Sequence, residues 1–411
     1  MSKPIWTPVK MSSSFDSRLA QQFAEQNILS LDVLRRRQSM KWQHYALDIL
    51  PAWVAEMDYA PAPAITDVLR HWHQDQDTGY PYRQRDRAEH TLARAFSRYM
   101  QRDFGWETDP TNVLAVNELV QAVYLLILAF SQPGDGVLLQ TPSYPPFYDA
   151  IRETGRRLQA SSLVDNGQGY EIDFDHLERQ IDASTRILLL CNPHNPTGRA
   201  FRREELEKLA ALAEAHDLLV IANEIHADLV LPGHQHIPFG SLRPDLASRT
   251  VTLNSASKSF NIAGLRCGLM YFGDGELKQR FTRRLPAKVL GYPSGVGIDA
   301  TVAAWDRGQP WLTGLRHYLY ERREQAIATL QHALPAVKLY APQATYFAWL
   351  DFSALSLPTA AGSHYLQHGK LALSAGETFI PSGGSFARLN FATSKQILQQ
   401  ILETLIDATP H

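Results

Sequence analysis

Short apolar runs alternate with longer amphipathic stretches through the middle of the chain. Stretches with helical spacing lie at residues 118–131, 145–154 and 203–216. Apolar runs of strand length lie at residues 113–116, 137–140, 186–190, 218–222 and 250–253. Short buried strands that alternate with helices are typical of a mostly parallel sheet with helices on both faces. The pattern therefore predicts an α/β fold.

The two ends of the chain carry a different pattern. Residues 1–30 are polar and lack strong periodicity, so we expect an arm or a frayed start. Residues 64–73 predict a helix, and residues 300–330 predict a long helix with a kink at Gln309-Pro310. Further strands are predicted at 337–340, 346–351 and 387–391, with a helix at 394–406. This last part is typical of a smaller α+β domain.

The chain of 411 residues is long enough for one large domain and one small domain. We predict that residues 60–299 form the large domain and residues 300–411 the C-terminal small domain. Residues 1–59 are expected to form an N-terminal arm and part of the small domain.

Composition narrows the class of protein. The net charge of −2 gives no reason to expect a nucleic-acid or membrane partner. Two cysteines exclude a disulfide framework and suit a reducing compartment. The N-terminus carries no apolar core of signal-peptide length, and the apolar run at residues 122–130 is too short to span a bilayer. We therefore expect a cytoplasmic protein.

A lysine with hydroxyl and arginine neighbours follows the strand predicted at residues 250–253. Ser255 and Ser257 precede Lys258, and Arg266 follows eight residues after the lysine. A partly buried lysine beside other cations has a lowered pKa and becomes a nucleophile, while serine and arginine side chains can bind a phosphate. A solvated Ser/Lys turn before a helix is the alternative for this motif alone.

Other polar side chains follow the ends of predicted strands. They are Asn195, Asn223 and His226, in addition to Ser255 and Lys258. Ligands of open parallel sheets bind at the carboxyl ends of the strands. We therefore expect these side chains to share one site.

Four motifs in fixed order carry a family resemblance. They are CNPHNPTG at residues 191–198, VIANEIH at 220–226, SASKSFNIAGLR at 255–266 and ARLNF at 387–391. The set resembles the fold-type I enzymes that depend on pyridoxal 5′-phosphate (PLP), the aspartate-aminotransferase superfamily. WVAEMD at 53–58 and QTPSYPPF at 140–147 are similar to the C–S lyase branch, the cystathionine β-lyase-like enzymes. The resemblance implies a large PLP-binding domain with a mostly parallel sheet of seven strands flanked by helices.

The resemblance also implies roles in cofactor binding. Lys258 is expected to hold PLP as a Schiff base and to act as the catalytic base. The phosphate is expected to contact Ser255, Ser257, Arg266 and the backbone amides near Glu118 and Leu119. The ring is expected to contact Tyr144, Asn195, Asn223 and His226.

The substrate is expected to be a small molecule, a sulfur-bearing amino acid such as cystathionine. Arg388 is expected to clamp its α-carboxylate, with Tyr144 and Asn195 nearby. Tyr80 is expected to reach the cofactor phosphate of a second subunit, which implies a homodimer. No metal is expected, because the two His-x-His pairs in the sequence lack a third ligand.

The activity implied is α,β-elimination at a C–S bond, which gives pyruvate, ammonia and a thiol. An aminotransferase, or a specialised biosynthetic PLP enzyme, remains the alternative, because the same residues serve both reactions. A regulatory binding protein on an enzyme-like scaffold is an alternative from another class, and intact Lys258 and Arg388 argue against it.

Three positions depart from the family pattern. Asn223 replaces an aspartate that pairs with the pyridine nitrogen, so we expect that nitrogen to be largely unprotonated here. Glu118 stands where a small residue is usual beside the phosphate, and we expect it to be a first-turn acid at a helix N-terminus. Glu56 replaces another aspartate.

Overall fold

The computed structural model describes residues 15–83 and 85–410. Within this part, eight strands form one central sheet in the order β4-β11-β10-β9-β8-β5-β6-β7. Their bounds are β4 (Val113–Val116), β5 (Gly136–Thr141), β6 (Arg157–Asp165), β7 (Tyr170–Ile172), β8 (Thr185–Cys191), β9 (Leu219–Asn223), β10 (Thr250–Asn254) and β11 (Gly268–Phe272). The predicted α/β class is confirmed, with one strand more than the seven expected.

The centre of this sheet is parallel, as predicted. Strands β6, β5, β8, β9 and β10 pair in parallel. Strand β11 runs antiparallel to both β10 and β4, and β7 runs antiparallel to β6. The spans predicted from apolar runs match β4, β5, β8, β9 and β10, whereas the sequence analysis missed β6, β7 and β11.

Helices cover both faces of the sheet. Successive residues of β5 point to opposite faces: Val137 and Leu139 pack in one core with Leu126 of α6, while Leu138 packs in another with Leu209 of α9. This alternation produces two buried layers, one on each side of the strands. The helices of this part are α5 (Ala88–Phe104), α6 (Leu119–Phe130), α7 (Pro145–Glu153), α8 (Phe174–Arg179), α9 (Arg203–Ala215), α10 (Gly275–Arg284) and α11 (Gly295–Arg307).

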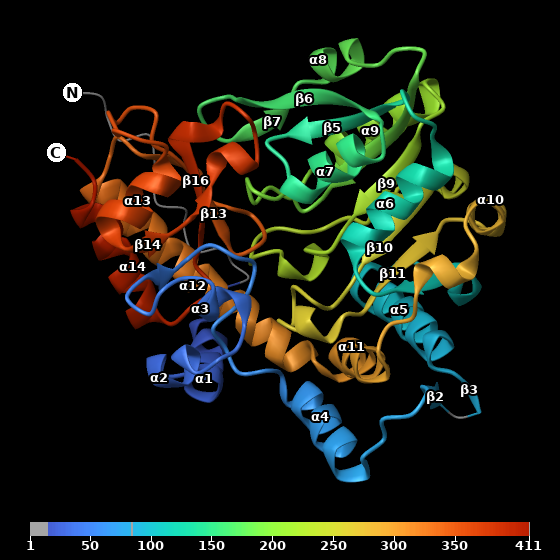
Figure 1. The fold of residues 1–411 in the computed structure, drawn as a ribbon, viewed down its shortest axis with the longest axis horizontal. Helices are drawn as coiled ribbons and strands as arrows, with labels where there is room; N and C mark the ends of the chain where they lie inside the picture. The colour runs from blue at the N-terminus through green and yellow to red at the C-terminus, as the bar shows by residue number, and fades with distance from the viewer. Residues whose placement is uncertain (1–14, 84, 411) are drawn as a thin grey trace.

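A second, antiparallel sheet lies beside the first, drawn in orange and red in Figure 1. Its strands are β12 (Lys338–Leu339), β13 (Phe347–Asp351), β16 (Phe386–Asn390) and β15 (Ser374–Ala375), in that order. Helices α13 (Ala361–Gly369) and α14 (Lys395–Asp407) belong to the same part. β1 (Leu50–Pro51) pairs with β14 (Leu371–Ala372), which joins the beginning of the chain to its end. The predicted domain boundaries stay a prediction.

Two expectations for the ends of the chain need correction. The long helix predicted at 300–330 is two helices, α11 and α12 (Gln309–Ala333), which are separated at Gly308. Residues 17–27 are not an arm but form α1 (Ser17–Asn27), which packs along α12. Phe23 is buried there against the rings of Tyr59, Trp311 and Tyr318. The first 14 residues of the predicted arm lie outside the described residues.

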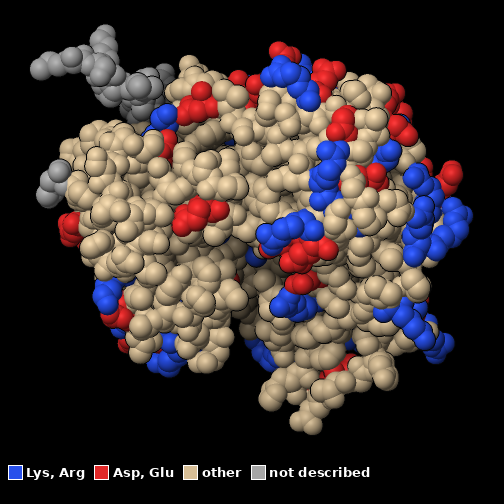
Figure 2. All heavy atoms as spheres, turned by 45° about the horizontal axis from the view of Figure 1, so that its top comes forward, with Lys and Arg blue, Asp and Glu red and all other residues tan. Residues whose placement is uncertain are grey.

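The remaining N-terminal elements connect α1 to the central sheet. They are α2 (Leu31–Arg35), α3 (Met40–Gln43), α4 (Pro63–Asp75), β2 (Tyr82–Arg83) and β3 (Asp86–Arg87). Helix α4 and the β2–β3 hairpin extend away from the rest of the molecule (Figure 1). On the face drawn in Figure 2, acidic and basic side chains lie next to one another, mainly in the right half of the view and around its edge. In the described ranges, every helix is too short or too polar to cross a bilayer.

Candidate active site

The carboxyl ends of the parallel strands surround a cavity of about 430 Å3. Its floor comes from the segments that follow β8, β9 and β10, and the start of α6 closes one side. Ten of the predicted site residues line it: Glu118, Leu119, Tyr144, Asn195, Asn223, His226, Ser255, Ser257, Lys258 and Arg266. The fold thus brings together residues that are up to 148 positions apart, such as Glu118 and Arg266.

Lys258 is the central cation of the cavity. Burial lowers the pKa of its amine to about 8; the charges of Arg388 and Arg266 lower it as well, while Glu56 acts in the opposite sense. Its Nζ makes one long hydrogen bond, 3.4 Å to the carbonyl of Ala55. A weakly held amine with a pKa near neutrality is suited to nucleophilic attack on a carbonyl group.

The loop before Lys258 is fixed by a serine. The Ser255 hydroxyl donates to the carbonyl of Cys267 at 2.6 Å and accepts from the backbone N–H of Ser257 at 3.1 Å. These bonds tie the end of β10 to the start of β11. The turn therefore holds Ser257 and Lys258 at the cavity wall.

The N-terminus of α6 provides an anion site. The first helical residue is Leu119, and the backbone at Leu119 and Val120 faces the cavity. Unpaired N–H groups and the positive end of the helix dipole favour an anion there. Glu118 was expected to be a first-turn acid, but it is the N-cap residue and its carboxylate is ion-paired with Arg266.

A buried arginine from the small sheet contacts a residue that lines the cavity. Arg388 of β16 donates to Asn195 Oδ1 at 2.7 Å, and through Nη2 to the carbonyl of Trp53 and the hydroxyl of Ser374, both at 3.1 Å. The ring of Phe347 lies 3.9 Å from its guanidinium carbon. Burial lowers the pKa of Arg388 to about 10, so it remains a cation at neutral pH.

Arg388 keeps donors for a ligand. A guanidinium has five N–H groups, and the bonds above use three of them. Nε is buried and has no partner among the described residues. Because its Oδ1 accepts from Arg388, Asn195 directs its amide N–H groups elsewhere, and the residue lines the cavity.

His226 and Asn223 lie side by side at the end of β9. Burial lowers the pKa of His226 to about 3, and Lys258 and Arg388 contribute to the same shift, so the imidazole is neutral. Its Nδ1 is buried without a partner in the described chain. Asn223 Oδ1 accepts from the backbone N–H of Ile225 at 3.3 Å, so its amide N–H groups are the ones available to the cavity.

Two predicted residues have other positions. Arg388 reaches the cavity through Asn195, as described above, and is not part of its lining. Tyr80 is fully exposed, between α4 and β2, and lies outside the cavity of its own chain. Neither position contradicts the expected roles, which stay predictions.

Several lining residues were not predicted as site residues. Phe147, Ala263 and Gly264 lie within motifs that the sequence analysis quoted, so closer attention to those motifs could have found them. Ala55 also lies within a quoted motif, WVAEMD at 53–58, whereas Met40, the first residue of α3, gives no signal in the sequence. Cys191 ends β8 and Cys267 directly precedes β11, and both thiols are free and buried.

The residues present fit PLP. The α6 N-terminus and Arg266 suit its phosphate, and the amine of Lys258 suits its aldehyde. The amide of Asn195 and the unpartnered His226 Nδ1 suit a ring oxygen. Asn223 can donate to the lone pair of a ring nitrogen but carries no charge to keep that nitrogen protonated.

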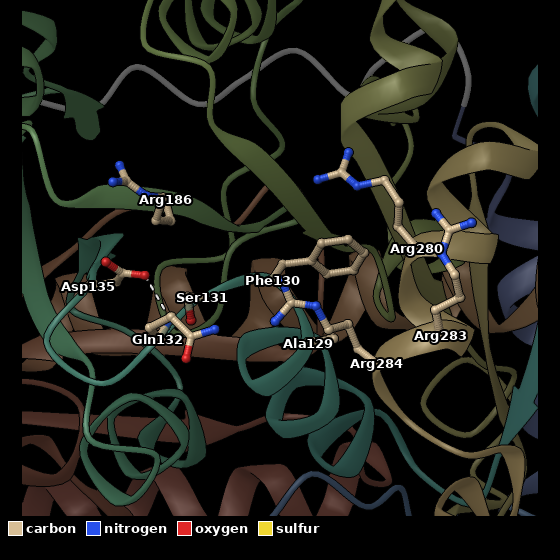
Figure 3. Close-up of a pocket in the computed structure, with 9 residues that line it drawn as sticks. All are labelled: Ala129, Phe130, Ser131, Gln132, Asp135, Arg186, Arg280, Arg283 and Arg284. Carbon is tan, nitrogen blue, oxygen red and sulfur yellow. Dashed lines mark hydrogen bonds between the residues drawn. The ribbon is translucent and has the colours of Figure 1, made fainter.

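A second hollow, of about 390 Å3, lies at the amino ends of the strands, opposite the carboxyl ends that surround the first cavity (Figure 3). Arg186 stands at the start of β8 and Asp135 directly before β5, so both mark amino ends of strands. Arg283 and Arg284 lie in the last turn of α10, where the helix dipole favours cations. The hollow contains none of the predicted catalytic residues, and the strand-end cavity is therefore the candidate active site.

Comparison with known proteins agrees with this site. The profile of the family "Aminotransferase class I and II" matches residues 49–405, so the chain belongs to that family. Cystathionine beta-lyase PatB of Bacillus subtilis is 37% identical over 375 residues, with 90% of this chain and 96% of the relative covered.

Two solved structures are similar over almost the whole chain. A putative PLP-dependent β-cystathionase from Corynebacterium diphtheriae has a TM-score of 0.88 and 29% identity, covering 94% of this chain and 99% of that one. The crystal structure of OvoB has a TM-score of 0.86 and 36% identity, covering 93% and 98%. The predicted family and fold are therefore confirmed.

Proposed function

We propose that this protein is a PLP-dependent C–S lyase that cleaves a sulfur-bearing amino acid by α,β-elimination. The products are pyruvate, ammonia and a thiol. The observation that carries the proposal is the amine of Lys258, with a pKa near 8, in a cavity lined by the start of α6, Arg266 and Asn195, with the buried Arg388 bonded to Asn195 behind that lining. Two relatives are named cystathionine beta-lyase, and the match to this chain covers most of their length. Their names support the reaction type.

The cofactor supplies one part of the chemistry. Bound PLP supplies a conjugated ring that accepts the electron pair of the breaking Cα–H bond. Lys258 Nζ takes the proton from Cα, since part of the amine is unprotonated at neutral pH. The sulfur then leaves Cβ with its bonding pair as a thiolate, and the released aminoacrylate takes up water to give pyruvate and ammonia.

Other side chains hold the substrate and the cofactor. Arg388 binds the α-carboxylate through the N–H groups that have no partner in the described chain. Asn195 and neutral His226 donate or accept at the ring oxygen without adding charge. Tyr144, at the start of α7, packs on the cavity, and burial raises the pKa of its hydroxyl so that it stays protonated.

The experiment combines the protein with PLP and L-cystathionine. Pyruvate is followed with lactate dehydrogenase and the thiol with an aromatic disulfide reagent. Equal amounts of both products, lost in Lys258→Ala, are the expected result. A 2-oxo acid that keeps its sulfur, formed only when an amino-group acceptor is present, would identify an aminotransferase instead.

A homodimer is part of the proposal. Tyr80 is fully exposed, and Tyr82 is exposed opposite Arg87 in the β2–β3 hairpin. The guanidinium of Arg87 lies 5.5 Å from the centre of the exposed ring of Tyr292. An exposed aromatic patch of this kind is typical of an interaction surface. It supports the expectation that Tyr80 contacts the phosphate bound by a second subunit.

Mixed dimers test this arrangement. Tyr80→Phe and Lys258→Ala each impair every site of their own dimers. Mixing the two variants restores one complete site in each hybrid, so activity should return on mixing. Light scattering gives the mass in the same samples, and a monomer would contradict the proposal.

We further propose a cytoplasmic location. Cys191 and Cys267 are free and buried, which suits a reducing compartment. Cell fractionation with an antibody to the protein tests this point, and recovery in a membrane or secreted fraction would contradict it.

A further inference from the structure

Glu56 lies in the wall of the candidate active-site cavity and forms no ion pair with any cation in the described part of the chain. Glu56 lines the same cavity as Lys258, and its side chain is half-buried. Its Oε2 accepts one long hydrogen bond, 3.4 Å from the backbone N–H of Lys41 at the start of α3. Within residues 15–83 and 85–410, no lysine, arginine or histidine nitrogen lies within ion-pair distance of it.

The nearest lysine is committed to another acid. The ammonium of Lys41 is 2.7 Å from Asp58, and both side chains are almost completely buried. Asp58 also accepts from the indole N–H of Trp42 at 2.8 Å. The charge of Lys41 is therefore compensated by Asp58, whereas Glu56 forms no ion pair in the described ranges and interacts with the charges of Lys258 and Arg37 only beyond ion-pair distance.

The other charges of the cavity have partners or expected ligands. Glu118 is paired with Arg266 at the phosphate site. Arg388 is reserved for the α-carboxylate in the proposed function, and Lys258 for the cofactor. Glu56 is thus the acid of this cavity that remains available, and a half-buried carboxylate without a counterion favours a cationic ligand group.

We propose that Glu56 selects substrates whose sulfur substituent carries a positive charge, such as an ammonium group. The inference rests on the proposed lyase function, since that function assigns binding partners to the α-amino group and the α-carboxylate of the substrate. The α-amino and α-carboxylate groups are directed to the cofactor and to Arg388, so the substituent on sulfur is the part left to reach Glu56. Met40, which is 58% exposed at the same wall, offers an apolar contact for the methylene groups of that substituent.

An alternative role for Glu56 is to compensate the charge of Lys258. The carboxylate does raise the pKa of that amine, against the larger effects of burial and Arg388. In that case Glu56→Gln would change all substrates alike and would move the pH profile to lower pH. Selection by charge predicts instead a change confined to cationic substrates, so the two roles give different results.

Three substrates of similar length separate the charge from the size of the substituent. They are S-(2-aminoethyl)-L-cysteine, S-(2-hydroxyethyl)-L-cysteine and S-(2-carboxyethyl)-L-cysteine. For the holoenzyme we expect KM to be about five- to tenfold lower for the aminoethyl than for the hydroxyethyl compound, and highest for the carboxyethyl compound. In Glu56→Gln the three KM values should converge.

A binding measurement keeps the test independent of turnover. L-Lysine is the analogue of S-(2-aminoethyl)-L-cysteine in which a methylene replaces the sulfur, and L-norleucine is its uncharged counterpart; neither contains a C–S bond. Their dissociation constants follow from the change in cofactor absorbance. Preference for lysine over norleucine in the parent, lost in Glu56→Gln, is the expected result even if no pyruvate is ever formed.

The control removes a carboxylate outside the cavity. Glu153 is paired with the hydroxyl of Tyr124 on the surface, so Glu153→Gln should keep the preference of the parent. Equal binding of lysine and norleucine by the parent would overturn the proposal. The same preference in parent and Glu56→Gln would overturn it as well. If the parent prefers lysine over norleucine but forms no pyruvate from any of the substrates, the lyase function alone would be refuted.

Discussion

Arg388→Lys is the substitution that most directly tests the site. The guanidinium donates to Asn195, Trp53 and Ser374 and keeps Nε free, so it can be held in place while it binds a carboxylate. A lysine ammonium at this position keeps the charge but cannot donate in two parallel directions. The substitution therefore removes at least one charge-assisted hydrogen bond to the α-carboxylate.

The magnitude follows from that bond. A hydrogen bond to a charged group contributes about 1.5–3 kcal/mol, and about 1.4 kcal/mol corresponds to a tenfold change. We expect kcat/KM for L-cystathionine to fall by about 10- to 150-fold on this basis. The pyruvate assay with lactate dehydrogenase measures the change. An amine that lacks the α-carboxylate should bind parent and variant equally well.

The control is another buried arginine outside the cavity. Arg323 is 4% exposed and Arg388 5% exposed, so the two lose comparable burial on change to lysine. Arg323 donates to the carbonyl of Pro342 and packs on Tyr320. Arg323→Lys should lower the melting temperature without changing KM. A KM for Arg388→Lys within twofold of the parent, in a folded protein, would refute the assigned role.

Three further predictions concern the cofactor. The pKa of Lys258 is lowered to about 8 in the folded apoprotein, so the rate of covalent PLP attachment should rise with pH, with a midpoint near pH 8. The same shift in pKa should make the apoprotein more stable as pH rises from about 8 towards 10.5. A stopped-flow rate that is constant from pH 6.5 to 9.5 would contradict this pKa. Asn223→Asp should protonate the pyridine nitrogen, which ¹⁵N NMR of ¹⁵N-labelled PLP reports directly; an unchanged resonance would show that Asn223 does not face that atom. Glu118→Gln should free Arg266 and tighten PLP binding by about two- to fivefold, since the pair is largely exposed. Equilibrium dialysis measures this, and weaker binding would assign Glu118 a supporting role.

The sequence predicted the features that depend on local pattern. Apolar runs located five strands of the central sheet, and the order of strands and helices predicted parallel pairing. The rule that ligands bind at strand ends placed Asn195, Asn223, His226, Ser255 and Lys258 in one site, and all five line the same cavity. These predictions succeeded because side-chain alternation and turn chemistry act over a few residues.

Predictions failed where distant partners decide the structure. Residues 17–27 look polar in sequence, yet Phe23 finds Trp311 and Tyr318 far along the chain, and the segment becomes α1. Strand β11 carries an apolar run, GLMYF, that the sequence analysis overlooked, whereas strand β6 was missed because tertiary pairing, rather than a distinctive apolar pattern, defines it. A helix or strand of this kind is stabilised by packing against residues that its own sequence does not reveal.

The sequence by itself determined the fold class, the family and the set of residues at the strand ends. Only the tertiary structure decided which charges meet. It joined Glu118 to Arg266 across 148 positions and Arg388 to Asn195 across 193, and it placed Glu56 in the cavity wall with no ion-pair partner among the described residues. The physical reason is that the effect of a charge depends on distance and burial in space, whereas a sequence records only the order of the residues.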